Sequence, residues 1–175
     1  MRYLIALMFT LAASSAFAAT CDTDGRFTVN GDGTVTDSKT GLTWKQCLEG
    51  QTFAAGPPAA CNNAATFYTW QGALGLTANG FRVPNIKELQ SIVDEAKSTL
   101  VDPETPGGPV NPAIDTACFP TSAGVSVYVW SASPYTGDTS PPKAWLIDFN
   151  KGIFMYQFPQ SQTGYVNVRL VKDPQ

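Results

Sequence analysis

The sequence contains no histidine, which limits the chemistry that its side chains can perform. A serine or cysteine triad of the usual kind needs a histidine base, so that class of nucleophilic catalysis is excluded. Paired carboxylates could still act as acid and base, and the nearest pairs are Asp94 with Glu95 and Asp102 with Glu104. We expect the first pair on the solvent side of a helix end and the second on a loop. The sequence therefore predicts no catalytic residue and no enzyme activity.

The N-terminal segment, residues 1–18, is typical of a secretory signal peptide. Arg2 precedes a short apolar run, and residues 16–18 (AFA) form a cleavage site of the small-x-small type. The run is too short to span a bilayer, so we expect no membrane insertion. Cleavage after Ala18 would leave an exported protein in the periplasm, on the cell surface or secreted. Without Arg2 the 11 basic residues become 10 against 14 acidic ones, a net charge of −4 that argues against nucleic-acid binding.

The remaining chain contains four cysteines, namely Cys21, Cys47, Cys61 and Cys118. An even number of cysteines in an exported protein is typical of disulfide bonds, and four cysteines allow three connectivities. We favour a local Cys47–Cys61 bridge together with a long-range Cys21–Cys118 bridge. Irregular spacing and the lack of histidine argue against a zinc site, and the sequence predicts neither a metal ligand nor a cofactor.

Two short acidic turns superficially resemble the opening of a calcium-binding loop. They are residues 22–25 (DTDG) and residues 30–33 (NGDG). A complete calcium loop needs further oxygen ligands at set positions and a bidentate glutamate at its twelfth position, and neither segment has one. We therefore interpret both segments as hairpin turns.

Tryptophans and arginines could either bind a ligand or stabilise the core. The tryptophans are Trp44, Trp70, Trp130 and Trp145. Aromatic rings can stack on sugars, but three of the four lie in strand-like segments, which favours core packing for Trp44, Trp130 and Trp145. Arg82 and Arg169 could contact an anionic ligand. An arginine beside a strand end more often pairs with a carboxylate, here Glu88 or Asp148, so we predict structural roles for both.

Aromatic and polar residues cluster around loops late in the sequence. This mixture is typical of an adaptable binding face. The candidate ligand-binding residues are Tyr128, Ser131, Ser133, Tyr135, Asp138, Lys143 and Tyr156. We expect two irregular segments, 98–125 and 134–142, to be presented to the ligand, because long loops in compact domains are commonly functional.

A proline stop and a capping pattern mark the helix around which the chain is organised. Pro84 keeps the preceding residue out of the helical conformation. Asn85 is a good N-cap, and Glu88 can complete a capping box three residues later. Apolar residues at helical spacing then predict a helix as far as Ala96 with one buried face.

The remaining segments predict one more helix and several strands. The second helix is expected after Thr69 as its cap, and residues 79–80 (Asn-Gly) are expected to close it. The expected strands lie in a meander over 25–47, a strand over 127–133, a hairpin joining 143–149 to 153–158, and a last strand over 164–172. In the last strand we expect alternating buried and polar faces. Successive hairpins predict an antiparallel sheet with helices outside it, an α+β fold.

Six short motifs in a fixed order carry a resemblance to a known family. They are GDGTVTD (31–37), TGLTW (40–44), RVPNIKEL (82–89), WSAS (130–133), AW (144–145) and VRLV (168–171). In this order the chain resembles the Lcl-type C-terminal domain family over about residues 26–172. We therefore expect a signal peptide over 1–18 and a single domain of this type over 19–175.

The resemblance implies a fold similar to C-type lectins and to the formylglycine-generating enzymes. It also implies adhesin-like function, since the family namesake is a surface adhesin that binds sulfated polysaccharides. This chain lacks the collagen-like repeat of the namesake and is acidic, whereas a sulfated polymer favours a basic surface. The carboxylate-containing triplets of calcium lectins are not matched, and the copper-binding cysteine pair of the oxidases is not expected here.

These observations predict an exported, non-enzymatic binding module that recognises a glycan or a surface protein through its late loops. Two alternatives stay open. One is a structural subunit of a surface assembly, which stable self-association would favour. The other is a copper-dependent enzyme related to the formylglycine-generating oxidases, which a free thiol or tight copper binding would favour.

Overall fold

A computed structural model describes residues 20–98, 112–121, 127–137, 143–157 and 166–174. In chain order its strands are β1 (Phe27–Val29), β2 (Thr34–Asp37), β3 (Thr43–Lys45), β4 (Thr52–Ala54), β5 (Ala60–Asn62), β6 (Phe81–Arg82), β7 (Tyr128–Tyr135), β8 (Lys143–Asp148), β9 (Ile153–Gln157), β10 (Val166–Asn167) and β11 (Val171–Lys172). Its helices are α1 (Trp70–Leu74), α2 (Ile86–Ser91) and the 3-10 helix η1 (Glu95–Lys97). The described part of the chain is therefore mostly strand with short helices, consistent with the expected α+β class. None of the helices in these ranges is long and apolar enough to cross a bilayer.

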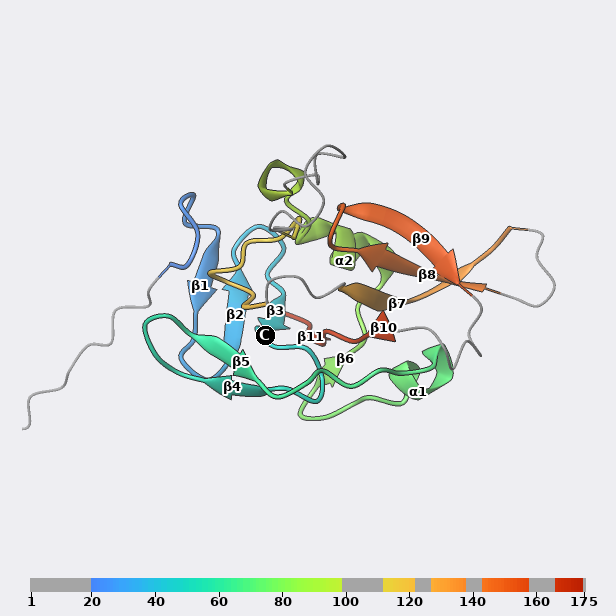
Figure 1. The fold of residues 1–175 in the computed structure, drawn as a ribbon, viewed down its shortest axis with the longest axis horizontal. Coiled ribbons are helices and arrows are strands. Elements are labelled where there is room, and N and C mark those ends of the chain that lie inside the picture. Colours follow the sequence, from blue (N-terminus) through green and yellow to red (C-terminus); the bar gives the residue numbers. More distant parts are fainter. Residues whose placement is uncertain (1–19, 99–111, 122–126, 138–142, 158–165, 175) are drawn as a thin grey trace, which may run out of the picture.

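The strands form two main sheets and a small separate hairpin (Figure 1). The first sheet has the order β1-β2-β3-β11-β6, and the second has the order β10-β7-β8-β9. The hairpin pairs β4 with β5, from Thr52 opposite Asn62 to Ala54 opposite Ala60. All pairings between these strands are antiparallel except that of β10 with β7, which is parallel. The prediction of an antiparallel sheet was therefore wrong at the edge of the second sheet formed by β10.

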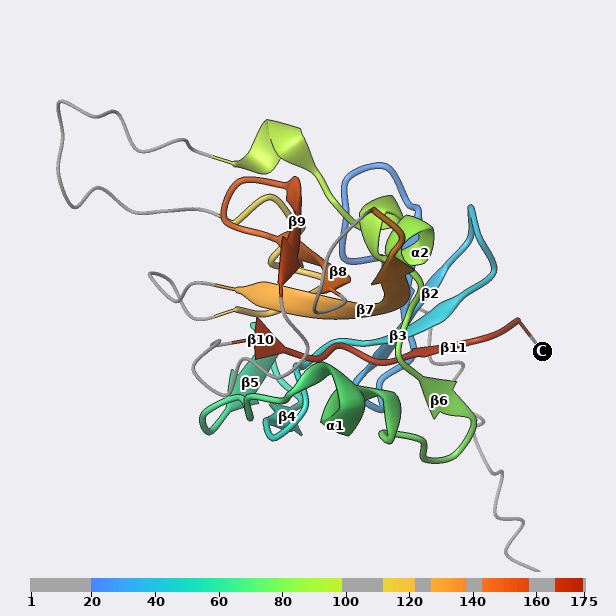
Figure 2. The same ribbon diagram turned by 90° about the vertical axis from the view of Figure 1, so that its right-hand side faces the viewer.

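The last predicted strand is divided between the two sheets. Its first part, β10, pairs with β7, and its second part, β11, pairs with β3 and β6. In Figure 2 this segment crosses from β10 on one side of the molecule to β11 beside β6. The predicted polar face does not exist, because Asn167 and Arg169 are as buried as Val168 and Leu170. A strand that joins two sheets is covered on both sides, which the alternation of residue types did not reveal.

Helix α2 begins as predicted. The Asn85 side chain accepts a hydrogen bond from the backbone N–H of Glu88 (2.9 Å), and the Glu88 carboxylate accepts one from the Asn85 N–H (2.7 Å), which completes the capping box. The helix ends at Ser91 rather than Ala96. Asp94 is extended there: its N–H donates to the Ala113 carbonyl and its carboxylate caps η1, so local polar contacts compete with continuation of the helix.

Helix α1 is capped by Thr69, as predicted, and is only five residues long. It ends at Gly75, which has right-handed helical torsions. Asn79 and Gly80 do not close it. Both have positive φ angles, 54° and 80°, and the Phe81 N–H donates to the Ala78 carbonyl, so they form a tight turn that leads into β6.

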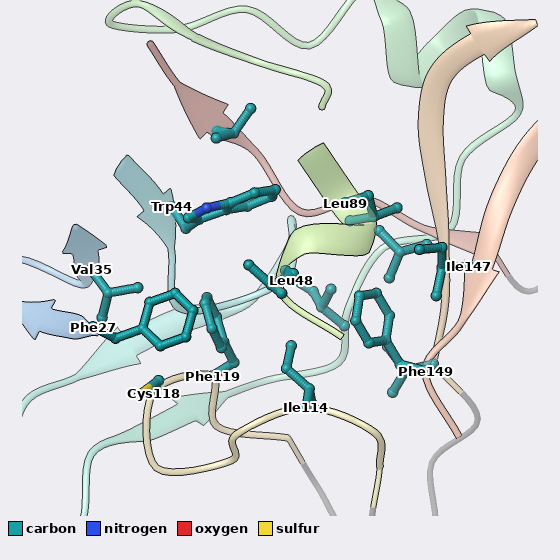
Figure 3. Packing of buried hydrophobic residues seen from close by; sticks show 14 of the residues in the cluster. Phe27, Val35, Trp44, Leu48, Leu89, Ile114, Cys118, Phe119, Ile147 and Phe149 are labelled. Carbon is teal, nitrogen blue, oxygen red and sulfur yellow. The ribbon is translucent and has the colours of Figure 1, made fainter. Parts of the chain in front are cut away.

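Two clusters of buried apolar side chains form the core. In the larger one, Trp44 from β3 and Phe27 from β1 pack with Phe119, and the cluster continues to Leu89 of α2 and Ile147 of β8 (Figure 3). The smaller cluster contains Trp130, Ala73, Leu146, Val168 and Leu170, with α1 against β7. Trp44 and Trp130 are fully buried, so the predicted core packing is confirmed for these two tryptophans.

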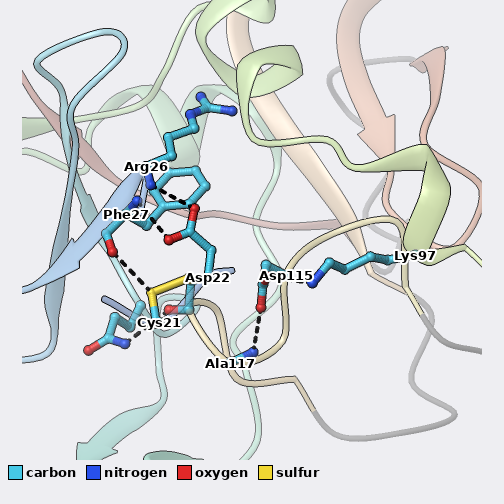
Figure 4. The surroundings of a disulfide bond; sticks show 9 residues. Cys21, Asp22, Arg26, Phe27, Lys97, Asp115 and Ala117 are labelled. Atoms are coloured by element: carbon cyan, nitrogen blue, oxygen red, sulfur yellow. Dashed lines mark hydrogen bonds and ion pairs between the residues drawn. A yellow bond between two sulfur atoms is a disulfide. The ribbon is translucent and has the colours of Figure 1, made fainter. Parts of the chain in front are cut away.

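Part of the segment expected to face a ligand belongs to the core instead. Within 98–125, residues 112–121 place Ile114, Cys118 and Phe119 in the larger cluster, each at most 1% exposed. The Cys21–Cys118 disulfide joins this segment to the start of the described chain (Figure 4). The prediction of a binding loop was therefore wrong for 112–121, and 99–111 and 122–126 lie outside the described residues.

The structure contains both bridges that the sequence favoured, Cys21–Cys118 and Cys47–Cys61, with sequence separations of 97 and 14 residues. We expect removal of the longer bridge by Cys21→Ser with Cys118→Ser to lower the free energy of unfolding by about 4.7 kcal/mol, against about 3 kcal/mol for Cys47→Ser with Cys61→Ser, because the longer closure restricts the unfolded chain more. Urea denaturation of the two double variants measures both losses. A larger loss for the shorter bridge would contradict this account.

A buried ion pair fixes the turn between β2 and β3. The Arg26 guanidinium donates two hydrogen bonds to the Asp37 carboxylate (2.8 and 2.6 Å), which also accepts from Thr40 Oγ1 and the Lys39 N–H. Burial alone would raise the pKa of Asp37, but the hydrogen bonds from Arg26, Thr40 and Lys39 outweigh it and hold the pKa below its ordinary value of 3.8. The unfolded carboxyl therefore takes up a proton at higher pH than the folded one.

The contribution of Asp37 to stability should accordingly be present above about pH 4 and disappear as the pH falls through its native pKa. We expect Asp37→Asn to lower the free energy of unfolding by about 2 kcal/mol at pH 7, because it weakens charge-assisted hydrogen bonds. The difference between variant and native protein should shrink as the pH falls below 3.8, the ordinary pKa of this carboxyl. Urea midpoints across this pH range test the prediction, and a constant difference would refute it.

Candidate functional site

Four aromatic side chains gather on one face of the second sheet. They are Tyr135 of β7, Trp145 of β8, and Phe154 and Tyr156 of β9, and we call them, with Lys143, the aromatic strip. The register explains the grouping, because Trp145 lies opposite Tyr156 and Lys143 lies opposite Tyr135. Side chains two residues apart on a strand share a face, so all five point to the same side.

The rings of the strip contact one another directly. Tyr135 and Tyr156 are stacked with centroids 4.4 Å apart. Trp145 meets Tyr135, Tyr156 and Phe154 edge to face at 5.0, 5.8 and 6.4 Å. The Lys143 ammonium lies 4.6 Å from the centre of the Tyr156 ring, within cation–π range. Trp145 is therefore the central ring of a cluster held by several mutual contacts.

The strip is open to solvent at its outer side. Phe154 and Tyr156 are 44% and 45% exposed, and β9, which carries them, is the last strand of its sheet. The inner end of the same face is covered, because Ile147 is buried in the core cluster that contains Leu89 of α2. The short helix thus covers one end of the sheet face and leaves the end around Trp145 uncovered by the core.

The structure brings together three of the predicted binding residues, namely Tyr135, Lys143 and Tyr156. Ser131 is fully buried and its hydroxyl donates to the Trp145 carbonyl (2.9 Å). The Ser133 hydroxyl accepts from the Ile86 N–H (3.0 Å) and so supports the start of α2.

The two remaining predicted binding residues are Tyr128 and Asp138. Tyr128 packs against the smaller core cluster. Asp138, with the rest of 138–142, lies outside the described residues.

Sequence reasoning missed two members of the strip. Trp145 was assigned to core packing but is only partly buried, and Phe154 was not considered. The signal was present in the predicted hairpin: a turn at residues 150–152 places Trp145 opposite Tyr156, and Phe154 lies two residues before Tyr156 on the same face.

The two arginines have different partners. Arg82 forms a two-pronged pair with Glu88 (2.8 and 2.9 Å) and also contacts Asp173, and these carboxylates raise its pKa. The predicted pairing with Glu88 is confirmed. For Arg169 the expected carboxylate partner was wrong, because its guanidinium donates to the carbonyl of Lys45 (2.9 Å) and to that of Gln46.

The surroundings of Arg169 indicate a structural role for this residue. Its side chain is fully buried, and its guanidinium lies 4.9 Å from the centre of the Phe119 ring. Burial lowers the pKa of Arg169 to about 9. Because the side chain is buried and its Nη1 donates to carbonyl groups, it is not accessible to an anionic ligand.

Several carboxylates within the described ranges accept hydrogen bonds from nearby backbone N–H groups. Asp22 accepts hydrogen bonds from the N–H groups of Arg26 and Phe27, and Asp32 accepts one from the Thr34 N–H, as expected for turns. Asp94 caps η1, and the other candidate pair, at 102 and 104, lies outside these ranges. In the described part of the chain no group of three or more cysteine or carboxylate side chains could hold a metal ion.

Comparison with known proteins identifies one family. The Lcl C-terminal domain matches residues 33–172, a range that begins in the turn before β2 and ends with β11. No curated protein and no solved structure matches the chain significantly. Because the match spans most of the sequence and includes every strand listed above except β1, the chain belongs to the Lcl C-terminal domain family.

Proposed function

We propose that this protein is an exported, non-enzymatic binding module that recognises a glycan through the aromatic strip. The observation that carries the proposal is the set of four mutually packed rings on an open sheet face. The proposal includes a signal peptide over 1–18, one domain over 19–175, a C-type-lectin-like fold and an adhesin-like role at a cell surface or in the periplasm. Membership of the Lcl C-terminal domain family supports a surface-associated role.

The chemistry of the strip suits a sugar ring. Aromatic faces provide apolar contact, while the hydroxyls of Tyr135 and Tyr156 can exchange hydrogen bonds with a polar ligand. The rings already pack against one another, so binding would order few additional side chains. Lys143 adds a positive charge beside Tyr156, which would favour a glycan that carries a carboxylate or a sulfate within an otherwise acidic protein.

The cysteine bonding supports a non-enzymatic role. An oxidase of the related type needs a cysteine pair to hold copper, and all four cysteines of this chain are in disulfides. The carboxylates of Asp22, Asp32 and Asp94 accept hydrogen bonds from nearby backbone N–H groups, which is a structural use of these side chains.

We expect Tyr156→Ala and Trp145→Ala each to weaken glycan binding at least about 10-fold, since either truncation removes a ring from the centre of the contact. The measurement is a glycan array of the oxidised chain 19–175, with sulfated and neutral polysaccharides, followed by titration calorimetry on the best glycan. Binding should persist with a calcium chelator.

Phe67→Ala is the matched control, because Phe67 is 50% exposed and lies outside the strip. It should leave the affinity unchanged. Equal losses for Phe67→Ala and Tyr156→Ala, or no glycan bound by the native chain, would reject the strip as a glycan site.

A second candidate function, a structural subunit of a surface assembly, is favoured by β9. This strand ends its sheet, and its residues Ile153, Phe154 and Tyr156 are all more than two-fifths exposed. An exposed apolar edge strand is a template for pairing with another chain.

If β9 pairs between copies, light scattering after size exclusion should show concentration-dependent association. Ile153→Lys should abolish it, because a charge on an edge strand opposes pairing. Lys172→Ala, a change on a different sheet, is the control. A monomer at every concentration would exclude this second function and leave the glycan proposal intact.

A further inference from the structure

Two tyrosines of the strip form a pair whose geometry suits a covalent reaction between their rings. Tyr135 and Tyr156 are stacked, with an interplanar angle of 29° and centroids 4.4 Å apart. This distance is at the short end of the range for aromatic pairs. The contacts of Trp145 with the same two rings are edge to face, whereas in the stacked pair the ring carbons of both tyrosines face each other.

The pair is open to an oxidant from solvent. Tyr156 is 45% exposed on the last strand of its sheet, and Tyr135 is half-buried beside it. Trp145 contacts both rings, at 5.0 and 5.8 Å, so an electron removed from Trp145 can be replaced from either tyrosine. All four cysteines are in disulfides, so no free thiol competes for the oxidant.

We propose that Tyr135 and Tyr156 are a site of oxidative modification, at which the two rings are joined within one chain as dityrosine. The oxidant is hydrogen peroxide acting through a haem peroxidase. Each phenol loses one electron and one proton, and the two radicals join through the ring carbons next to their hydroxyls. The hydrogens on these carbons then move to the oxygens, which restores both hydroxyl groups. The peroxide takes up the electrons and protons and leaves as water.

The new bond would join strands that do not pair with each other in the sheet. Strand β9 ends the sheet and is hydrogen-bonded to β8, while β7 lies on the other side of β8. Dityrosine would attach β9 to β7 across β8 and so restrict the opening of this edge, as a disulfide restricts the chain that it closes. The reaction needs only the two rings and the oxidant, so the proposal is independent of glycan binding.

Gly137 keeps the Tyr135 ring in its place beside Tyr156. A Cβ atom on Gly137 would overlap the hydroxyl end of the Tyr135 ring, at Cε1, Cζ and Oη. Because the end of a side chain moves more easily than the backbone, Gly137→Ala should displace this ring. The variant keeps both tyrosines, so it separates the effect of ring position from that of composition.

The test treats the oxidised chain 19–175, at low protein concentration, with hydrogen peroxide and a plant haem peroxidase. We expect dityrosine fluorescence, a monomer that has lost two hydrogen atoms by mass spectrometry, and a cross-linked peptide that joins Tyr135 to Tyr156. Tyr135→Phe and Tyr156→Phe should each abolish the product, because phenylalanine has no phenol to oxidise. Gly137→Ala should slow its formation several-fold. Amide exchange along β9 should be slower in the cross-linked monomer.

Tyr128→Phe is the matched control, because Tyr128 packs against the smaller core cluster and lies outside the strip. It should leave the rate of dityrosine formation unchanged. A native chain that forms no dityrosine, a product that joins two chains or maps to other tyrosines, or full yield in Tyr135→Phe would each show that the proposal is wrong. An unchanged rate in Gly137→Ala would refute the role assigned to ring position.

Discussion

The fold depends on the burial of residues 166–172 between its two sheets. Backbone N–H groups of Lys45, Glu49 and Tyr68 donate to carbonyls of this segment at 2.9–3.0 Å, although the donors come from three different parts of the chain. The Arg169 side chain returns hydrogen bonds to carbonyls of the same region. Side chains of this segment pack in both core clusters, and every side chain from Val166 to Val171 is buried.

The larger core cluster joins segments that are far apart in sequence. Trp44, Phe119 and Leu89 belong to a strand, an irregular segment and a helix, and their packing brings those three parts together. The Cys21–Cys118 bridge reinforces the same junction at the edge of β1. An irregular segment can be this well buried because its own polar groups are paired, for example the Ala113 N–H with the Phe149 carbonyl.

The second sheet carries the strip on one face and core side chains on the other. Along β8, Ala144 and Leu146 point into the smaller cluster, while Trp145 points to the strip. Side chains alternate between the two faces of β8, so the aromatic strip lies directly over a packed core. This packing limits the movement of its rings. A packed core thus supports the aromatic strip.

Local residue patterns alone determined several helix caps, one hairpin and the family of this protein. The capping box at Asn85, the Thr69 cap, the hairpin between β8 and β9, and the family motifs all depend on neighbours in sequence, so each was predictable. The disulfide pairing was favoured but not fixed, because four cysteines allow three connectivities.

Only the tertiary structure decided which side chains meet. The alternation in 164–172 predicted a polar face, yet contact with both sheets buried Arg169 and removed its expected carboxylate partner. Trp145 was assigned to the core because it lies in a strand-like segment, but it is only partly buried, since packing decides which parts of that sheet face are covered. The predicted hairpin could place Trp145 beside Tyr156, but the contact of Tyr135 with both rings depends on pairing and burial that involve residues remote in sequence.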